Sequence, residues 1–285
     1  MAIAFVFPGQ GSQSVGMLAD LAESASEVRA TFDEASAALG EDLWALTQEG
    51  PEETLNRTDR TQPAMLAAGV AVWRAWQARG GARPTAMAGH SLGEYTALVC
   101  AGSLAFDEAV RLVADRGRFM QEAVPAGEGA MAAILGLDDE TVIGLCDQAA
   151  QGDVVQAVNF NAPGQVVIAG DTAAVERAVA AAKESGAKRA VTLPVSVPSH
   201  CSRMRPAAER LAERLEGVAI EAPAVPVIHN VDAAPATEPA AIRDALVRQV
   251  ENPVRWVASV QRMAADGATD FVEAGPGKVL AGLIK

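Results

Sequence analysis

The sequence has few of the residues that would suggest a secreted, membrane-bound or nucleic-acid-binding protein. It contains three cysteines in 285 residues, and their odd number and scattered positions (Cys100, Cys146 and Cys201) favour a reducing compartment. No two of them have the spacing of metal ligands, and no apolar run approaches the roughly 20 residues of a membrane-spanning helix. The net charge of −13 argues against nucleic acid or an anionic membrane as the main partner. These absences predict a globular, cytoplasmic protein without a metal site.

Hydrophobic residues make up 50% of the chain, which is enough for one large domain or for a core with a smaller insert. The first residues, MAIAFVFPGQGSQ, include no basic segment and predict a buried strand instead of a signal peptide. Strand-like runs at 3–7 and 85–88 flank amphipathic helical patterns near 16–39 and 63–79. This alternation predicts an α/β fold with a parallel sheet.

The order of elements changes at 128–195. A strand, a helix, two strands, a helix and a strand are expected there, at 130–135, 138–150, 154–159, 165–169, 172–185 and 190–194. This β-α-β-β-α-β order is typical of a ferredoxin-like module. We therefore expect a ferredoxin-like subdomain at 128–195, inserted into a core formed by 1–127 and 196–285. The core resumes with helices or strands at 204–215, 225–230, 240–250, 254–265 and 270–273.

The pentapeptide Gly89-His90-Ser91-Leu92-Gly93 fits the G-x-S-x-G pattern of a nucleophile elbow. It lies between a short apolar run at 86–88 and a helix-forming run at 94–101, the strand-to-helix context that the pattern requires. The two glycines let the strand and the helix approach closely, and the turn raises the serine hydroxyl above the sheet. The pattern predicts Ser91 as a nucleophile, and a chance match is the alternative.

A serine hydroxyl needs a base to take its proton, and the chain has three histidines. His90 adjoins Ser91, and neighbouring side chains in a tight turn diverge. His229 lies within a predicted strand, where a role in the core or on the surface is the simpler interpretation. His200 lies on a loop that Pro198 stiffens, which suits a general base. The alternative for His200 is a loop histidine that only packs.

The glycine-flanked loop at 8–13 follows the first predicted strand. A dinucleotide-binding fingerprint would need a glycine in place of Ser14 and an acid after a second strand, whereas Asp33 lies in a predicted helix, so we reject that interpretation. The loop can instead turn the Gln10 amide toward the elbow, where it would form a two-donor oxyanion hole with the Leu92 amide. A plain strand–helix turn is the alternative.

Arg116 falls on the apolar side of the helix predicted at 106–124. The apolar positions along that side are Phe106, Ala109, Val113, Met120 and Ala123. A guanidinium among them cannot lose its charge and must be paired. The pattern leaves open whether its partner is a structural acid or the carboxylate of a ligand.

Five motifs, in order along the chain, resemble those of the bacterial malonyl-CoA:acyl carrier protein transacylases. They are Phe-Pro-Gly-Gln-Gly-Ser-Gln at 7–13, Gly-His-Ser-Leu-Gly-Glu at 89–94, Asn-Phe-Asn-Ala-Pro-Gly-Gln at 159–165, Pro-Ser-His-Cys at 198–201 and Asn-Pro-Val-Arg-Trp at 252–256. The resemblance covers essentially the whole chain. It implies an α/β-hydrolase-like core with an inserted ferredoxin-like subdomain.

The resemblance also implies a role for each candidate residue in acyl transfer. Ser91 matches the acylated nucleophile and His200 its base. The main-chain carbonyl of Gln249 would orient this histidine in place of a triad acid. Gln10 and Leu92 match the residues whose amides form the oxyanion hole.

Four further positions bear on the substrate and its surroundings. Arg116 matches the arginine that binds the free carboxylate of malonate, which favours a ligand as its partner. Asn161 and Ser199 would surround the reacting groups without reacting themselves. His229 stands where members of the family tend to carry asparagine, which weakens it further as a base.

The activity that the resemblance implies is transfer of a malonyl group from coenzyme A to the phosphopantetheine thiol of an acyl carrier protein, through a malonyl-serine, in fatty-acid or polyketide biosynthesis. It implies no metal and no redox cofactor, and we expect a monomer. Acyl carrier proteins are acidic, as is this chain, so docking would need a local basic patch. Candidates for that patch are Lys188, Arg189, Arg203, Arg205 and Arg210.

Two other functions fit parts of the pattern. A serine hydrolase would use the same acyl-enzyme and discharge it with water, although an arginine in the pocket argues against a lipase or a simple esterase. A non-catalytic docking subunit could retain the fold without the chemistry. The joint presence of Ser91, His200 and Arg116 argues against the second alternative.

Overall fold

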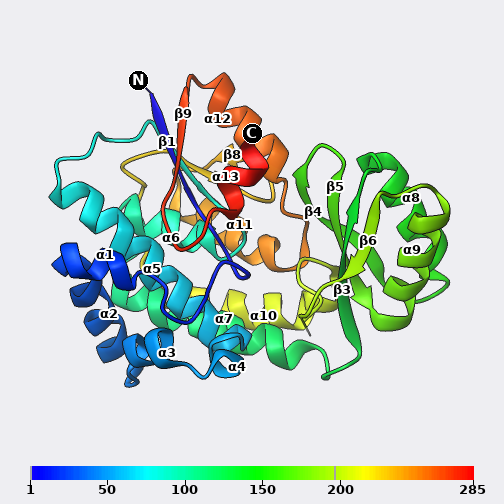
Figure 1. Ribbon diagram of the computed structural model, residues 1–285, viewed down its shortest axis with the longest axis horizontal. Helices are drawn as coiled ribbons and strands as arrows, with labels where there is room; N and C mark the ends of the chain where they lie inside the picture. The colour runs from blue at the N-terminus through cyan, green and yellow to red at the C-terminus, as the bar shows by residue number, and fades with distance from the viewer. Residues whose placement is uncertain (1, 196) are drawn as a thin grey trace.

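A five-stranded sheet forms the centre of the larger part of the molecule (Figure 1). The computed structural model describes residues 2–195 and 197–285. The strand order is β8-β7-β2-β1-β9, and β1 pairs in parallel with both β2 and β9. β7 is parallel to β2, whereas β8 pairs antiparallel with β7. The strands are β1 (Ile3–Phe7), β2 (Ala86–Gly89), β7 (Val227–His229), β8 (Ala234–Pro235) and β9 (Asp270–Glu273).

Helices cover both faces of this sheet, which explains why β1 is an unbroken apolar run. Phe5 and Phe7 face the larger hydrophobic core, whereas Ala4 and Val6 face a second core that includes Trp256. The helices of this part are α1 (Ala19–Ser24), α2 (Ser26–Leu39), α3 (Leu43–Glu49), α4 (Glu52–Leu55), α5 (Thr58–Ala78), α6 (Gly93–Cys100), α7 (Phe106–Ala123), α10 (Arg205–Glu216), α11 (Pro239–Glu251), α12 (Trp256–Ala265) and α13 (Val279–Ile284), with a short 3-10 turn at Ser202–Met204. The arrangement confirms the predicted α/β-hydrolase-like core with a parallel sheet.

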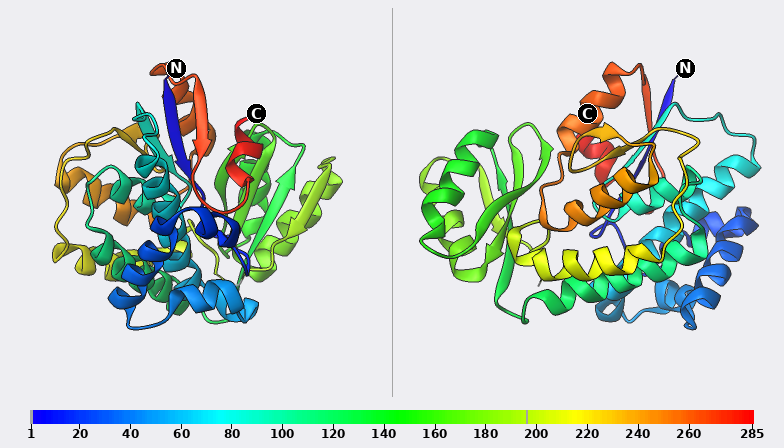
Figure 2. Two further views of the ribbon diagram at one scale, coloured as in Figure 1. Left: turned by 60° about the vertical axis from the view of Figure 1, so that its left-hand side comes forward. Right: turned by 180° about the vertical axis from the view of Figure 1, so that it is seen from behind.

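A four-stranded antiparallel sheet lies to one side of the core (Figures 1 and 2). Its order is β4-β5-β3-β6, and helices α8 and α9 cover its outer face. The elements are β3 (Gly129–Leu135), α8 (Asp139–Ala150), β4 (Val155–Ala162), β5 (Gln165–Asp171), α9 (Thr172–Glu184) and β6 (Arg189–Thr192). This βαββαβ order confirms the ferredoxin-like prediction. The boundary expected between 127 and 128 stays a prediction, and the one expected at Ser196 lies outside the described residues.

Several local predictions were wrong. The single helix expected at 16–39 is two helices, because Ala25 is extended (φ −137°, ψ 98°) and interrupts the hydrogen-bond ladder. Helix α5 begins at Thr58, more than one turn before Pro63, and thereby brings Gln62 into the buried part of the molecule. The sequence patterns did not predict α3, α4, α13 or β8.

No helix in the described residues is both long enough and apolar enough to span a membrane.

Candidate active site

Ser91 occupies the sharp turn between β2 and α6. Its backbone has a φ of 52°, in the left-handed region that residues other than glycine rarely adopt. A Cβ on Gly89 would overlap the backbone of Gly93, and one on Gly93 would overlap the carbonyl of Phe7. These two glycines are therefore required for the turn to form against β1. The serine hydroxyl is consequently presented at the carboxyl ends of β1 and β2.

Asn230, which the sequence analysis did not single out, fastens this turn. The Ser91 amide donates to Asn230 Oδ1 over 2.8 Å, and Asn230 Nδ2 donates to the Gly89 carbonyl over 2.7 Å. The asparagine side chain thus replaces backbone partners that a strained turn cannot supply. Asn230 is fully buried, so its contacts hold the nucleophile in one orientation.

His200 is the histidine that the structure brings to the serine. Its Nε2 lies 2.8 Å from Ser91 Oγ, and its Nδ1 lies 2.8 Å from the main-chain oxygen of Gln249. A carbonyl oxygen only accepts hydrogen bonds, so Nδ1 carries the proton and the lone pair of Nε2 faces the hydroxyl. Burial, reinforced by the positive charge of Arg116, lowers the pKa of His200 to about 3. The imidazole is therefore neutral at physiological pH.

The other two histidines are engaged elsewhere. His90 Nε2 lies 2.8 Å from Asn161 Oδ1, and burial lowers the pKa of His90. His229 Nδ1 lies 2.7 Å from Glu94 Oε1. Burial opposes the protonation of His229, but the charge and hydrogen bond of Glu94 outweigh it and raise the pKa of His229. The structure pairs neither histidine with Ser91.

Arg116 lies beside the serine with only 1% of its surface exposed. One terminal nitrogen donates to Gln62 Oε1 over 2.7 Å, and the other donates to Gln249 Oε1 over 2.9 Å and to Ser91 Oγ over 3.3 Å. The guanidinium carbon also lies 5.3 Å from the centre of the Tyr95 ring, within the range of a cation–π contact. Among the described residues, then, no carboxylate pairs with this buried cation.

Glu94, in the first turn of α6, is a buried acid that Gln249 connects to Arg116 by hydrogen bonds. Its Oε1 accepts from His229. Its Oε2 accepts from the main-chain N–H of Asn230 over 2.8 Å and from Gln249 Nε2 over 3.0 Å. Gln249 Nε2 also donates to the Ser91 carbonyl over 2.9 Å. The sequence did not predict these contacts of the Gln62, Glu94 and Gln249 side chains, because only the fold brings the segments around positions 62, 94, 116 and 249 together.

Gln10 and Leu92 border the cavity that Ser91 also lines. Gly9 brings their two loops together, since a Cβ there would lie 2.5 Å from the His90 carbonyl. No described residue accepts a hydrogen bond from the main-chain N–H of Gln10 or of Leu92. Two main-chain N–H groups that donate to no described residue, beside a serine hydroxyl, could stabilise an oxyanion.

The cavity around Ser91 has a volume of about 130 Å³ and extends between the two sheets. Ser199 borders the cavity, and its hydroxyl lies 3.4 Å from the Val197 carbonyl. Asn161 does not line the cavity but contacts His90, which does. The other lining residues include Thr58, Gln62, Met120, Met131, Asn159, Leu193, Val195 and Val197. Its wall therefore combines apolar side chains with polar ones, and the polar ones include the Arg116 cation, the Ser91 hydroxyl and the imidazoles of His90 and His200.

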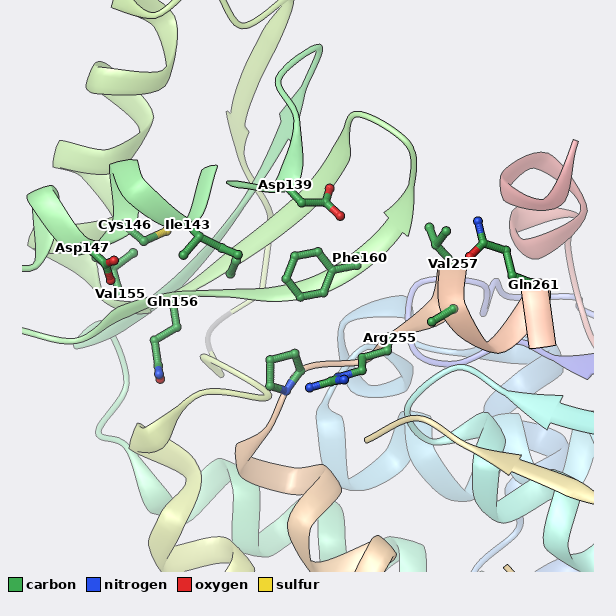
Figure 3. Close-up of a pocket in the computed structure, with 13 residues that line it drawn as sticks. Asp139, Ile143, Cys146, Asp147, Val155, Gln156, Phe160, Arg255, Val257 and Gln261 are labelled. Atoms are coloured by element: carbon green, nitrogen blue, oxygen red, sulfur yellow. The ribbon is translucent and has the colours of Figure 1, made fainter. Parts of the chain in front are cut away.

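A second and larger cavity, of about 620 Å³, lies between α8, β4 and the start of α12 (Figure 3). Ile143, Phe160 and Val257 supply apolar surface, and Arg255 lies at its edge. Neither a serine nor a histidine lines it among the described residues, and burial raises the pKa of Cys146 there to about 12. The groups suited to acyl transfer are thus confined to the smaller cavity. The described residues also contain no cluster of three or more His, Cys, Asp or Glu side chains that could hold a metal.

The basic patch expected for docking is largely neutralised by neighbouring acids. Arg203 lies 3.1 Å from Asp171, Arg205 lies 3.2 Å from Glu251, and Arg210 pairs with Glu122. Lys188 and Arg189 form no ion pair with any residue that the structure describes. The five residues consequently do not form one uniformly basic surface.

A parallel sheet that presents an elbow serine to a neutral, carbonyl-oriented histidine defines a serine acyltransferase or hydrolase. Residues 4–285 match the family model described as the acyl transferase domain. Over 282 residues the chain is 64% identical to the malonyl CoA-acyl carrier protein transacylase of Escherichia coli strain K12, an alignment covering 99% of this chain and 91% of that protein. The chain therefore belongs to the acyl transferase family and, within it, to the malonyl-CoA:acyl carrier protein transacylases.

Two solved structures have the same architecture over the whole chain. The acyl carrier protein S-malonyltransferase of Vibrio cholerae is 60% identical, with a TM-score of 0.98, covering 100% of this chain and 93% of that one. A malonyl-transacylase solved in complex with its type II polyketide synthase acyl carrier protein is 58% identical, with a TM-score of 0.99, covering 100% and 92%. These similarities agree with the family predicted from the five motifs.

Proposed function

We propose that this protein transfers a malonyl group from coenzyme A to the phosphopantetheine thiol of an acyl carrier protein, through an acyl-enzyme on Ser91. The observation that carries the proposal is the meeting of a serine–histidine pair with an arginine that has no acid partner among the residues that the structure describes. The pair supplies chemistry for a thioester, and the arginine supplies a site for a second, anionic end of the acyl group.

In the first half-reaction, His200 Nε2 takes the proton of Ser91 Oγ as the oxygen attacks the thioester carbonyl. The negative charge that develops on the carbonyl oxygen is stabilised by the Gln10 and Leu92 amides. The carbon–sulfur bond then breaks, and the departing thiolate takes the proton back from His200. The Gln249 carbonyl holds the imidazole in the required tautomer and orientation throughout, the task of a triad acid in other serine enzymes.

The second half-reaction reverses these steps. The carrier protein's thiol gives its proton to His200 and attacks the malonyl ester of Ser91. The new thioester forms as the ester bond breaks, and the proton returns to Ser91 Oγ. No metal or redox cofactor takes part in this scheme, and coenzyme A enters only as part of the substrate.

Arg116 favours malonyl over acyl groups without a carboxylate. One guanidinium nitrogen lies 3.3 Å from Ser91 Oγ. A carboxylate bound to the guanidinium would therefore lie close to the carbonyl that Ser91 attacks, as the short malonyl group requires. The interaction would be charge-assisted and shielded from bulk water. The same contact would position the thioester for attack.

We propose that the carrier protein docks on the side of Lys188 and Arg189, which pair with no acid in the described part of the chain. We also propose that the protein acts as a monomer in the cytoplasm. Support for a carrier-protein partner comes from the relative solved in complex with one. This chain's own pathway, fatty-acid or polyketide synthesis, is set by the carrier proteins that it meets.

The experiment that tests the transfer is incubation with malonyl-CoA in the presence and absence of a holo acyl carrier protein, with both malonyl-carrier protein and free malonate quantified by mass spectrometry. We expect malonyl-carrier protein to form much faster than free malonate. Release of malonate at the same rate with and without the carrier protein, and no loaded carrier protein, would identify a hydrolase instead.

A further inference from the structure

The partners of Arg116 have a property that the proposed reaction alone does not explain. A buried cation is costly, and proteins ordinarily pair it with a carboxylate. Here the acceptors are two amide oxygens and one hydroxyl: Gln62 Oε1, Gln249 Oε1 and Ser91 Oγ. Gln62 and Gln249 are themselves 1% and 0% exposed, so these two acceptors are shielded from bulk water.

A carboxylate is close at hand but is held away from the cation. Both oxygens of Glu94 are occupied, one by His229 and the other by the Asn230 amide and Gln249 Nε2. The amide of Gln249 stands between the two charges, with its nitrogen donating to Glu94 and its oxygen accepting from Arg116. This orientation fixes which end of the amide faces the guanidinium.

Gln62 holds the opposite side of the guanidinium. It lies in the second turn of α5, and its nitrogen lies 3.5 Å from the sulfur of Met120, a weak acceptor. Because that sulfur cannot donate, it favours the orientation in which Oε1 faces Arg116. The two glutamines therefore hold the planar fork from two sides without adding a negative charge.

We propose that Gln62 and Gln249 are specificity-determining positioning residues, which hold Arg116 in place with neutral acceptors and so keep its charge available for the substrate's carboxylate. A glutamate has the same length as glutamine and would bind the guanidinium more strongly. It would also occupy the cation before malonyl-CoA arrives. The amides therefore give up stability of the empty enzyme in favour of selectivity for an acyl group that carries a free carboxylate. This inference rests on the proposed malonyl transfer.

The test is Gln62→Glu, which places a carboxylate where Oε1 now lies 2.7 Å from the guanidinium. We expect kcat/KM for acylation by malonyl-CoA to fall at least tenfold, while kcat/KM for acetyl-CoA stays within about threefold of wild type. The melting temperature should stay equal or rise, because the buried cation gains an acid partner. Selectivity and stability would then move in opposite directions, which damage to the fold cannot produce.

Two further variants serve as comparison. Gln77→Glu adds the same charge to an exposed position on the same helix, and it should change neither donor's kcat/KM. Gln62→Met keeps the length of the side chain but removes the acceptor, so malonyl transfer should fall severalfold with a smaller change for acetyl-CoA. The Met variant keeps the test decisive if the Glu variant does not fold.

The outcomes separate this inference from the proposed function. An unchanged malonyl-to-acetyl ratio in Gln62→Glu or in Gln62→Met would overturn the role of the amides. So would a parallel fall for both donors with a lowered melting temperature, since Gln62 would then support only the fold. Failure of the wild-type protein to accept a malonyl group on Ser91 would instead overturn the function itself.

Discussion

Replacing Arg116 by alanine should invert the protein's preference between malonyl-CoA and acetyl-CoA. The arginine contacts the nucleophile's oxygen directly and has no acid partner among the described residues, so its loss leaves no buried carboxylate unpaired. What it leaves are the acceptors of Gln62 and Gln249, each of which costs about 1–3 kcal/mol when buried without a donor. The variant should therefore be less stable but folded.

The effect on malonyl transfer is expected to be much larger than the effect on acetyl transfer. Removing one partner of a buried ion pair costs about 3–5 kcal/mol, because the remaining charge stays desolvated. At about 1.4 kcal/mol per tenfold, this corresponds to a loss between roughly 10²- and 10⁴-fold in kcat/KM. An acetyl group has no carboxylate and should lose little. It gains the volume that the guanidinium vacates.

The measurement is kcat/KM for acylation by each donor in wild type, Arg116→Ala and Arg116→Lys. The lysine variant keeps the charge but not the planar fork, so it should fall between the other two for malonyl-CoA. Circular dichroism and melting curves establish that each variant is folded. A parallel loss for both donors in folded Arg116→Ala would refute the carboxylate-binding role of Arg116.

The remaining predictions concern the histidines. His200→Ala should lower the rate of acylation by about 10²- to 10⁴-fold. His229→Asn should change this rate little, because asparagine keeps a donor for Glu94. Steady-state rates of the two variants test this, and the reverse ranking would make His229 the base. Because the pKa of His200 is about 3 in the folded protein and about 6.5 when unfolded, the unfolded chain binds the extra proton below pH 6.5. Acidification from pH 7 to 5 should thus cost the wild type about 2 kcal/mol that His200→Ala does not lose, as measured by urea unfolding at each pH; equal losses would contradict a buried neutral His200.

The sequence predicted those parts of the site that depend on local pattern. The elbow could be recognised because two glycines, a serine and the strand and helix around them are contiguous. The burial of Arg116 followed from the spacing of apolar residues along its helix, and the structure places it at 1% exposure. The ferredoxin-like order of elements could be predicted in the same way, because the apolar residues of each strand and helix follow a clear period.

Contacts between distant positions could not be predicted in this way. The amides of Gln62 and Gln249 meet Arg116 only because α5, α7 and α11 converge on one cavity, and no local signal distinguishes these glutamines from exposed ones. The ion pairs of three of the five basic-patch candidates could not be predicted for a related reason. The acids that pair with Arg203, Arg205 and Arg210 lie 32 to 88 residues away along the chain.

The most direct test of the account is the mass of the protein after brief exposure to malonyl-CoA without a carrier protein. We expect a covalent adduct with the mass of one malonyl group, located by peptide mapping on the segment that contains Ser91, and lost when a holo acyl carrier protein is added. The Ser91→Ala variant, which should fold normally because the turn makes no large packing contact through the hydroxyl, should form none. An adduct on another residue, or transfer to the carrier protein by Ser91→Ala at an appreciable rate, would contradict the acyl-enzyme on Ser91.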